Sequence, residues 1–245
     1  MPATPAWPPK SMPRLFVATP LAAGATVELE AGQANYLGNV MRLGIGEHVL
    51  LFDGKSGEWI ARIAEAGRKR MTLAVEDRTR EQEQVPDCRL AFAPVKRAQT
   101  DWLVEKATEL GIAWLLPVVT QRTIVERVKL ERLRAIAVEA AEQCNRTSVP
   151  MIDEPTPLAT FLKVQSGRTL YFADEAGGEP AAKAFRPGPA MILTGPEGGF
   201  TDEERSAIRA APNAVAISLG PRILRAETAA LAAVTTYMAL AGDWR

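Results

Sequence analysis

Apolar and polar positions follow two different rhythms along this chain, and the change between them divides it into two regions. In the first region, residues 14–82, runs at 47–52, 58–63 and 71–75 alternate apolar with polar side chains and are separated by glycine-containing turns. A period of two is typical of strands that bury one face, so we expect antiparallel strands that close as a small β-barrel. Residues 33–43 have apolar positions at helical spacing instead, which predicts one short helix among the strands.

The second region, from residue 89 onward, alternates strand signals with helix signals. This alternation predicts an α/β fold, a mainly parallel sheet with helices on both faces. The expected strands are 90–93, 114–119 and 169–173, and the expected helices are 100–110 and 130–143, with a short apolar segment at 158–162. The helix at 130–143 should bury one face that consists of Leu130, Leu133, Ala137, Ala140, Ala141 and Cys144.

Two units of strand, loop and helix follow each other near the C-terminus. The first has the apolar run 191–193, a glycine-rich loop at 194–200 and a helix that starts at Thr201 and Glu204, which have the spacing of a capping box. Because the carboxyl ends of parallel strands meet at one edge of a sheet, both loops should lie at the same edge. The second unit repeats the plan with strand 214–219, loop 220–225 and an alanine-rich helix at 226–242.

The same patterns give the expected domain boundaries. Residues 1–12 are rich in proline and have no periodicity, so we expect a disordered tail. Residues 13–82 form the small β domain, residues 83–88 a linker, and residues 89–245 the α/β domain. Residues 174–189, rich in alanine, glycine and proline, should form a long connection close to the two loops.

Composition narrows the possible functions. With 245 residues, of which 47% are hydrophobic, the chain can bury two modest cores. Its 29 basic and 29 acidic side chains cancel, so any contact with nucleic acid must come from local clusters of charge. Cys88 and Cys144 have no second pair of cysteines with which to form a metal site, and no apolar run approaches the roughly 20 residues that span a bilayer. We therefore expect a cytoplasmic protein without a metal or a membrane anchor.

Glycine in the two C-terminal loops has two possible explanations. In open α/β sheets such loops bind small ligands, because glycine lets backbone amides approach closely. Alternatively, glycine only shortens the turns from strand to helix. The loops contain neither the phosphate-binding lysine pattern nor a GxGxxG fingerprint, which argues against ordinary nucleotide phosphate binding.

The two loops also carry a long double motif. The segments Gly195-Pro196-Glu197-Gly198-Gly199-Phe200 and Leu219-Gly220-Pro221-Arg222-Ile223-Leu224-Arg225-Ala226-Glu227-Thr228-Ala229 resemble the paired signature of the bacterial 16S ribosomal RNA uridine-N3 methyltransferases, a SPOUT-class family. Shorter matches stand in the family's order at 36–37, 40–43, 51–54, 106–111 and 139–143, so the resemblance extends from about Pro13 to the C-terminus. Ala226 stands where threonine is common in that family, and Cys144-Asn145 replaces a pair of small or polar residues.

The resemblance implies a fold, a reaction and partners. A SPOUT-class domain has a mainly parallel α/β sheet with a C-terminal trefoil knot, here preceded by a PUA-like RNA-binding barrel, and it is usually a homodimer. It binds S-adenosylmethionine in a bent shape, and the expected reaction is methylation of N3 of a uridine in 16S rRNA of the small ribosomal subunit. The expected cofactor-binding residues are Leu193, Thr194, Gly195, Gly198, Gly199, Leu219, Gly220, Ile223 and Leu224.

Basic side chains at turns and sheet-edge loops are the candidates for contact with RNA phosphates. They are Arg42, Arg68, Arg70, Lys96, Arg97 and Arg122. Residues 68–70 lie at the tip of an expected hairpin, where the alternative is an ordinary solvated turn.

Methylation of uridine N3 requires loss of its proton, which spreads negative charge onto the flanking carbonyl oxygens. We expect Glu197, in the first loop, to accept or relay the proton, and Arg225, in the second loop, to stabilise the oxyanion. The alternative is an ion pair between Arg225 and either Glu197 or Glu227 that braces the loops.

Two other functions stay open. One is a methyltransferase that acts on another RNA position. The other is a non-catalytic RNA-binding or ribosome-assembly module whose α/β domain is only a docking surface. Saturable binding of S-adenosylmethionine would separate this module from both enzymes.

Overall fold

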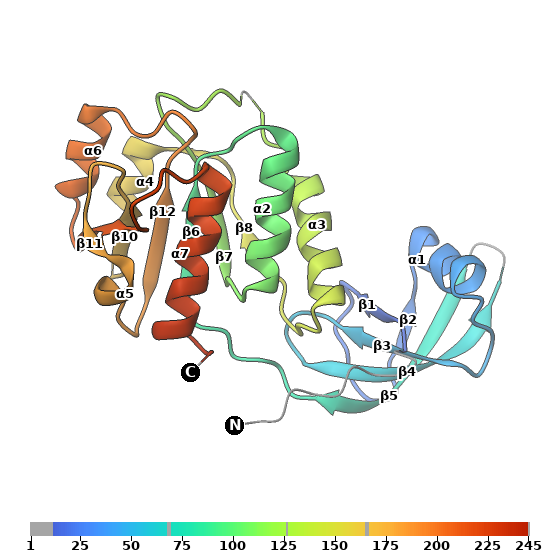
Figure 1. Cartoon of the computed structure of the whole chain (residues 1–245). Coiled ribbons are helices and arrows are strands. Elements are labelled where there is room, and N and C mark those ends of the chain that lie inside the picture. Colours follow the sequence, from blue (N-terminus) through green and yellow to red (C-terminus); the bar gives the residue numbers. More distant parts are fainter. Residues whose placement is uncertain (1–11, 68–69, 126, 165–166, 245) are drawn as a thin grey trace. The chain divides into compact units, whose positions relative to one another are not determined.

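A computed structural model of the protein describes residues 12–67, 70–125, 127–164 and 167–244 (Figure 1). The expected tail, apart from Met12, lies outside these residues, and so does Arg68 of the expected RNA contacts. The chain divides into two compact units. The first unit consists of Met1–Glu83 with Asn145–Ser148, and the second unit of Gln84–Cys144 with Val149–Arg245.

The first unit is built on a five-stranded sheet in the order β1-β3-β4-β5-β2. β3, β4, β5 and β2 pair antiparallel, as the alternating pattern predicts, whereas β1 pairs with β3 in parallel. No pairing between the outer strands β1 and β2 is present in the described residues, so closure into a barrel stays a prediction. The strands are β1 (Arg14–Phe16), β2 (Thr26–Glu28), β3 (His48–Phe52), β4 (Glu58–Ala66) and β5 (Met71–Arg80).

A short helical segment covers the core of this sheet where the helical spacing predicts one. It consists of α1 (Ala31–Asn35) followed by η1 (Tyr36–Val40), a π-helical turn. Leu37 is fully buried and packs in one cluster with strand residues such as Val49 and Leu73. The segment therefore contributes directly to the core of the first unit.

Glu58 is a buried carboxylate between two arginines of the first unit. Arg14 Nε donates to Glu58 Oε2 at 2.5 Å, and Arg80 Nη2 donates to the same oxygen at 2.8 Å. Burial by itself would raise the pKa of Glu58, but hydrogen bonds from Arg80 and Arg14, together with their positive charges, hold this pKa below its usual value. The same arginines donate to the carbonyls of Asn145 and Arg146, so the network also fixes this segment within the unit.

The second unit is built on an eight-stranded sheet whose pairings are all parallel, as the alternating pattern predicts. The strand order is β11-β13-β10-β12-β6-β7-β8, with β9 paired to β7. The strands are β6 (Cys88–Phe92), β7 (Trp114–Val119), β8 (Met151–Ile152), β9 (Thr156–Pro157), β10 (Thr169–Ala173), β11 (Glu179–Pro180), β12 (Ala190–Thr194) and β13 (Ala214–Ser218).

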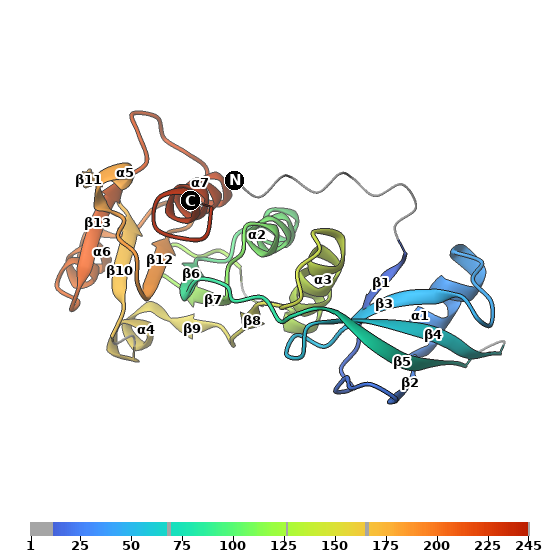
Figure 2. The ribbon, with the colours of Figure 1, turned by 90° about the horizontal axis from the view of Figure 1, so that it is seen from below.

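Helices cover both faces of this sheet (Figures 1 and 2). Successive strand residues face opposite sides, so Tyr171 and Ile192 pack on one core while Phe172 and Leu193 pack on the other. The first core is covered by α2 (Arg97–Glu109), α3 (Leu130–Gln143), α5 (Ala181–Ala184) and α7 (Ala226–Leu240), and the second by α4 (Leu158–Val164) and α6 (Asp202–Arg209). Within the described ranges, no helix is both long enough and apolar enough to cross a membrane.

Two expectations for the second region have different outcomes. Residues 174–189 form the expected long connection, between β10 and β12, and this connection also contains β11 and α5; Phe185 beyond α5 packs edge-on against Tyr171 and Tyr237. Cys144 is not a core residue of α3. The helix ends at Gln143 and Cys144 is its half-buried C-cap, so the helical spacing no longer applies there. The other five residues of the predicted face are buried.

Replacement of Glu58 by Gln should destabilise the first unit by about 3 kcal/mol at pH 7, because two arginines lose their buried counter-charge. The folded-state pKa of Glu58 is lowered, so the stabilisation is present above the unfolded-state pKa and is lost as pH falls through the folded-state value. The difference between wild type and Glu58→Gln should therefore shrink in acid. Chemical denaturation at pH 7 and pH 4 measures it, and native-state hydrogen exchange assigns the loss to β3, β4 and β5.

The matched control is Glu76→Gln, whose half-exposed carboxylate pairs with His48 and Arg62 at 3.2 Å. A pair of this kind is worth at most about 1 kcal/mol. Equal effects of the two substitutions at pH 7 would show that the buried network is not a special source of stability.

Candidate active site

The site is positioned by three neighbouring parallel strands. β10 lies between β12 and β13, and its residue Tyr171 is in register with Ile192 on one side and Val215 on the other. The three strands therefore end at the same level, and the loops that follow them meet at one edge of the sheet. A cavity of about 210 Å³ opens at this edge.

Most of the expected cofactor-binding residues line this cavity. They are Thr194, Gly195, Gly199, Leu219, Gly220, Ile223 and Leu224. Two others do not: Leu193 is fully buried in the core beneath α4 and α6, and Gly198 is exposed and lies under the side chain of Arg122. The two loops that the sequence places at one edge are thus brought together around a single cavity.

Backbone rather than side chain forms much of the wall in both loops. Gly199 has φ +68° and its amide donates to the carbonyl of Pro196 at 2.9 Å, which closes a tight turn. Gly220 has φ +105°, and a Cβ added there would meet no atom within 4 Å. Both values favour glycine, and the open space at Gly220 leaves the backbone accessible to a ligand.

The capping box predicted at the start of α6 is confirmed, and it also ties a third loop to the site. Thr201 Oγ1 accepts from the amide of Glu204 at 3.2 Å, and Glu204 Oε2 accepts from the amide of Thr201 at 3.0 Å. The second oxygen of Glu204 accepts from the amide of Gln121 at 2.7 Å. One buried carboxylate therefore joins the loop after β7 to the end of the glycine-rich loop.

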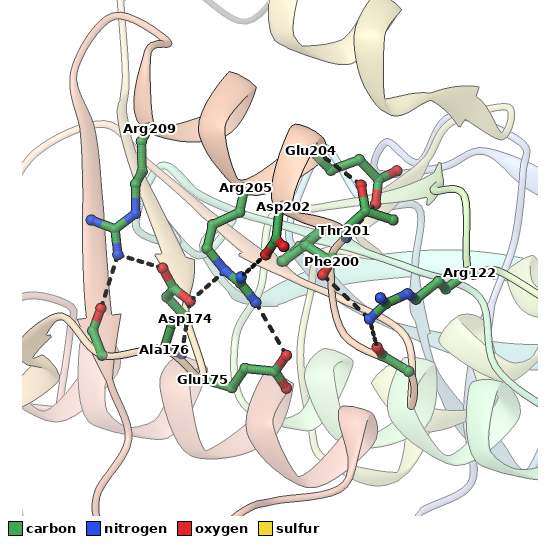
Figure 3. A network of polar contacts seen from close by, with 12 residues as sticks. Arg122, Asp174, Glu175, Ala176, Phe200, Thr201, Asp202, Glu204, Arg205 and Arg209 are labelled. Atoms are coloured by element: carbon green, nitrogen blue, oxygen red, sulfur yellow. Dashed lines mark hydrogen bonds and ion pairs between the residues drawn. The ribbon is translucent and has the colours of Figure 1, made fainter.

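The segment after β10 is fixed to α6 by a second buried carboxylate (Figure 3). Asp174 accepts from Arg205 Nε at 3.0 Å and from Arg209 Nη2 at 2.5 Å, and its side chain is 1% exposed. Arg205 also donates from Nη2 to Glu175 Oε1 at 3.2 Å and from Nη1 to Asp202 Oδ1 at 2.8 Å. Because buried charges require partners, this network holds the end of β10 against α6.

Arg122, one of the expected RNA contacts, lies against the glycine-rich loop (Figure 3). Its Nη1 donates to the carbonyl of Gly198 at 2.5 Å and to that of Phe200 at 3.5 Å. A Cβ on Gly198 would come within 3.2 Å of Arg122 Cδ, so the side chain packs directly on that glycine. Arg122 therefore links two carbonyls of the glycine-rich loop and restricts the movement of that loop.

The two expected catalytic residues differ in position. Glu197 is exposed and lines the cavity, whereas Arg225 is exposed as the N-cap residue of α7 and does not line it. No ion pair joins Arg225 to Glu197 or Glu227 among the described residues, so the bracing alternative has no support in this geometry.

Sequence reasoning missed several residues of the cavity. The charged ones are Asp174, Glu175, Arg205 and Arg222. A signal for the first two was present, because both acids follow directly after the strand at 169–173, whose carboxyl end faces the same edge. Arg205 is harder to find, since it reaches the cavity from a surface helix.

The other expected RNA contacts are dispersed. In the first unit, Arg42 is exposed with φ 59°, and Arg70 pairs with Glu28 at 2.6 Å. In the second unit, Lys96 and Arg97 follow β6, next to β12, and so lie at the edge that carries the cavity. Throughout the described part of the chain, no group of three or more His, Cys, Asp or Glu residues is arranged to hold a metal ion.

Replacement of Arg122 by Ala should loosen the glycine-rich loop. It should raise the dissociation constant of S-adenosylhomocysteine, the demethylated form of the expected cofactor, about 5-fold, which is the affinity that one exposed charge-assisted hydrogen bond contributes. Titration calorimetry measures it. Arg97→Ala is the control, since Arg97 pairs only weakly with Asp101 at 3.9 Å and touches no loop carbonyl. Unchanged cofactor affinity in Arg122→Ala would show that this arginine does not support the glycine-rich loop, whether or not it also contacts RNA.

Comparisons with known proteins agree over nearly the whole chain. Residues 81–238 match the model of the RNA methyltransferase domain, and residues 29–76 match that of the RNA methyltransferase PUA domain. The ribosomal RNA small subunit methyltransferase E of Synechocystis is 34% identical over 93% of this chain and 77% of its own length. The protein of the same name from Rickettsia conorii is 30% identical over 90% of this chain and 93% of its own.

Solved structures of similar proteins contain the expected cofactor. A ribosomal RNA small subunit methyltransferase E from Neisseria gonorrhoeae, bound to S-adenosylmethionine, superposes with a TM-score of 0.87 at 30% identity and covers 96% of this chain and 100% of its own. A putative methyltransferase from Legionella pneumophila, also with bound S-adenosylmethionine, gives 0.86 at 28% identity over 96% and 100%. From its two matching domains and these relatives, the chain belongs to the PUA-containing RNA methyltransferase family.

Proposed function

We propose that this protein transfers the methyl group of S-adenosylmethionine to N3 of a uridine in 16S rRNA of the small ribosomal subunit. The observation that carries the proposal is the cavity between the loops after β10, β12 and β13, which is lined by both halves of the double glycine motif. Relatives that share most of the chain are named for methylation of small-subunit ribosomal RNA, and one was solved with this cofactor.

The residues present fit an adenine nucleoside. The edge of an adenine ring needs hydrogen bonds, which the backbone around Gly195 and Gly220 can supply, and its two faces need apolar cover. Leu219, Ile223 and Leu224 offer that cover. Ile223 is 94% exposed at the cavity wall, so contact with a ligand would bury apolar surface that is now in water.

The cofactor supplies an electrophilic methyl group when it is bound, so the chain itself must orient the uridine and remove its N3 proton. Glu197 is the acceptor that we assign to this proton, because it is an exposed carboxylate in the wall of the cavity. Arg225, at the start of α7, is assigned to the carbonyl oxygen that gains negative charge. The two side chains would then act from opposite loops.

The proposal also covers contacts with RNA, a homodimer and the cellular compartment. Lys96, Arg97 and Arg122 would meet phosphates at the cavity edge, and Arg42 and Arg70 would meet them in the first unit. The homodimer is proposed from the resemblance, and it could bury exposed apolar side chains on and after α7 and on α2, such as Leu240, Trp244 and Trp102. The reaction is placed in the cytoplasm, where ribosomal RNA is.

Cofactor binding is tested by Ile223→Ser. The substitution should weaken S-adenosylhomocysteine about 10-fold, because the ligand loses apolar cover worth about 1.4 kcal/mol. The melting temperature should not change, since the side chain is almost fully exposed. Ile45→Ser is the matched control, a 67% exposed isoleucine in the first unit. If the wild-type protein gave no saturable calorimetric response, the non-catalytic RNA-binding module would be the better explanation.

The catalytic assignment is tested by single-turnover methyl transfer to small-subunit RNA with saturating cofactor. Glu197→Gln and Arg225→Met should each lower the rate at least ~100-fold while cofactor affinity is nearly kept. Glu179→Gln, an exposed carboxylate of β11 away from the cavity wall, should leave the rate unchanged. Loss of cofactor affinity or thermal stability in step with the rate would show that the two residues support the loops, and the proton would then leave by another route.

A further inference from the structure

Glu175 is a charged residue of the cavity wall to which neither the motif nor the proposed reaction gives a role. It follows Asp174 at the end of β10, and its half-exposed side chain lines the cavity. Its Oε1 accepts from Arg205 Nη2 at 3.2 Å, the longest of the three contacts that Arg205 makes with carboxylates (Figure 3). Arg205 thus holds Glu175 in place without enclosing it.

The carboxylate of Glu175 occupies the space that a side chain on Gly199 would take. A Cβ built on Gly199 would lie 2.5 Å from Glu175 Oε1 and 2.9 Å from Oε2, closer than real contacts allow. Gly199 also has φ +68°, which favours glycine there, whereas a larger residue would have to displace the carboxylate of Glu175. Glu175 is therefore seated directly on the backbone of the glycine-rich loop, between β10 and the first half of the double motif.

The surroundings of Glu175 carry one more negative charge than positive charge. Arg205 and Arg209 are shared by three carboxylates, those of Asp174, Glu175 and Asp202. Asp174 is buried and satisfied by both arginines and by the amide of Ala176, and Asp202 is 94% exposed to solvent. The other charged residues of the wall, Glu197 and Arg222, cancel each other. Glu175 is half exposed in the cavity wall, and among the described residues only its Oε1 accepts a hydrogen bond, from Arg205, so this carboxylate can accept a further donor.

S-adenosylmethionine has the charge that this wall lacks. Its sulfonium and ammonium groups are positive and its carboxylate is negative, which gives a net charge of +1. Only the ammonium group has both a positive charge and N–H donors, and a carboxylate binds such a donor through a charge-assisted hydrogen bond. The sulfonium has no donor hydrogen, and the ribose hydroxyls have no charge.

We propose, on the basis of the function proposed above, that Glu175 binds the ammonium group of the amino-acid end of S-adenosylmethionine. The glycine-rich backbone then holds the nucleoside end, and Glu175 fixes the other end of the same molecule. Glu175 is accordingly a specificity-determining residue, which selects ligands with an amino-acid chain over shorter adenine nucleosides. Arg205 is a positioning residue that acts through Glu175.

The test is a set of calorimetric titrations with three ligands. S-adenosylmethionine and S-adenosylhomocysteine carry the ammonium group, and 5′-methylthioadenosine lacks the whole amino-acid end. Glu175→Gln should weaken the first two at least ~10-fold, the low end for a hydrogen bond to a charged group, and leave the third unchanged. Asp202→Asn is the matched control, because it removes a carboxylate from the same guanidinium but outside the cavity wall, and it should change none of the three affinities.

Each other pattern overturns the proposal. Equal weakening of all three ligands would assign Glu175 to the ribose or to loop support, and weakening of S-adenosylmethionine alone would assign it to the sulfonium. No change in any affinity would remove it from the binding site. Glu175→Asp, which keeps the charge on a shorter side chain, should fall between wild type and Glu175→Gln for the two ammonium ligands only. If the wild-type protein bound none of the three ligands, the proposed function itself would fail, which is a different result from all of these.

Discussion

The position of β10 between β12 and β13 is the constraint on which the site depends. The three strands are neighbours in the sheet, and their parallel register places residues 169–172 beside 190–193 and residues 170–173 beside 214–217. Because the three strands run in the same direction, the segments that follow them meet at one edge of the sheet. These segments contain Glu175, the glycine-rich loop and the Gly220 loop. A cavity with walls from three separate segments follows from this arrangement without any special side chain.

Side chains then determine how firmly these walls are held. Polar side chains of α6 hold two of the neighbouring segments: Glu204 binds the loop after β7, and Arg205 and Arg209 bind the end of β10. Such buried carboxylates are costly unless they are fully paired, so each is stable only in the arrangement that pairs it. Under the proposed function, the loop backbone would bind the nucleoside, the α6 network would set the loop positions, and the exposed charged groups would remain available for chemistry.

The sequence alone predicts the periodic parts of this protein well. The parallel sheet, its helices and the capping box at Thr201 follow from the spacing of residues that are close in the sequence, so no distant contact has to be known to predict them. Features that depend on distant partners do not follow from it. Neither the half-burial of Cys144, nor the buried Ala181 and Ala184 of α5, nor the contact of Arg122 with Gly198 has a local signal. The position of Glu175 directly after the strand at 169–173 indicates the sheet edge, but its contact with Gly199 has no local signal. Periodicity predicts helices and strands but no family. The long double motif indicates the family, and the chain belongs to it.

Methylation of a uridine N3 in 16S rRNA at this cavity is tested most directly by mass spectrometry of that RNA from three strains. One strain has the wild-type gene, one lacks it, and one carries the Glu197→Gln variant in its place. Nuclease fragments of 16S rRNA should contain one 3-methyluridine in the first strain, and this residue should be unmodified in the second and mostly unmodified in the third. An identical pattern of methylated nucleosides in all three strains would contradict the account.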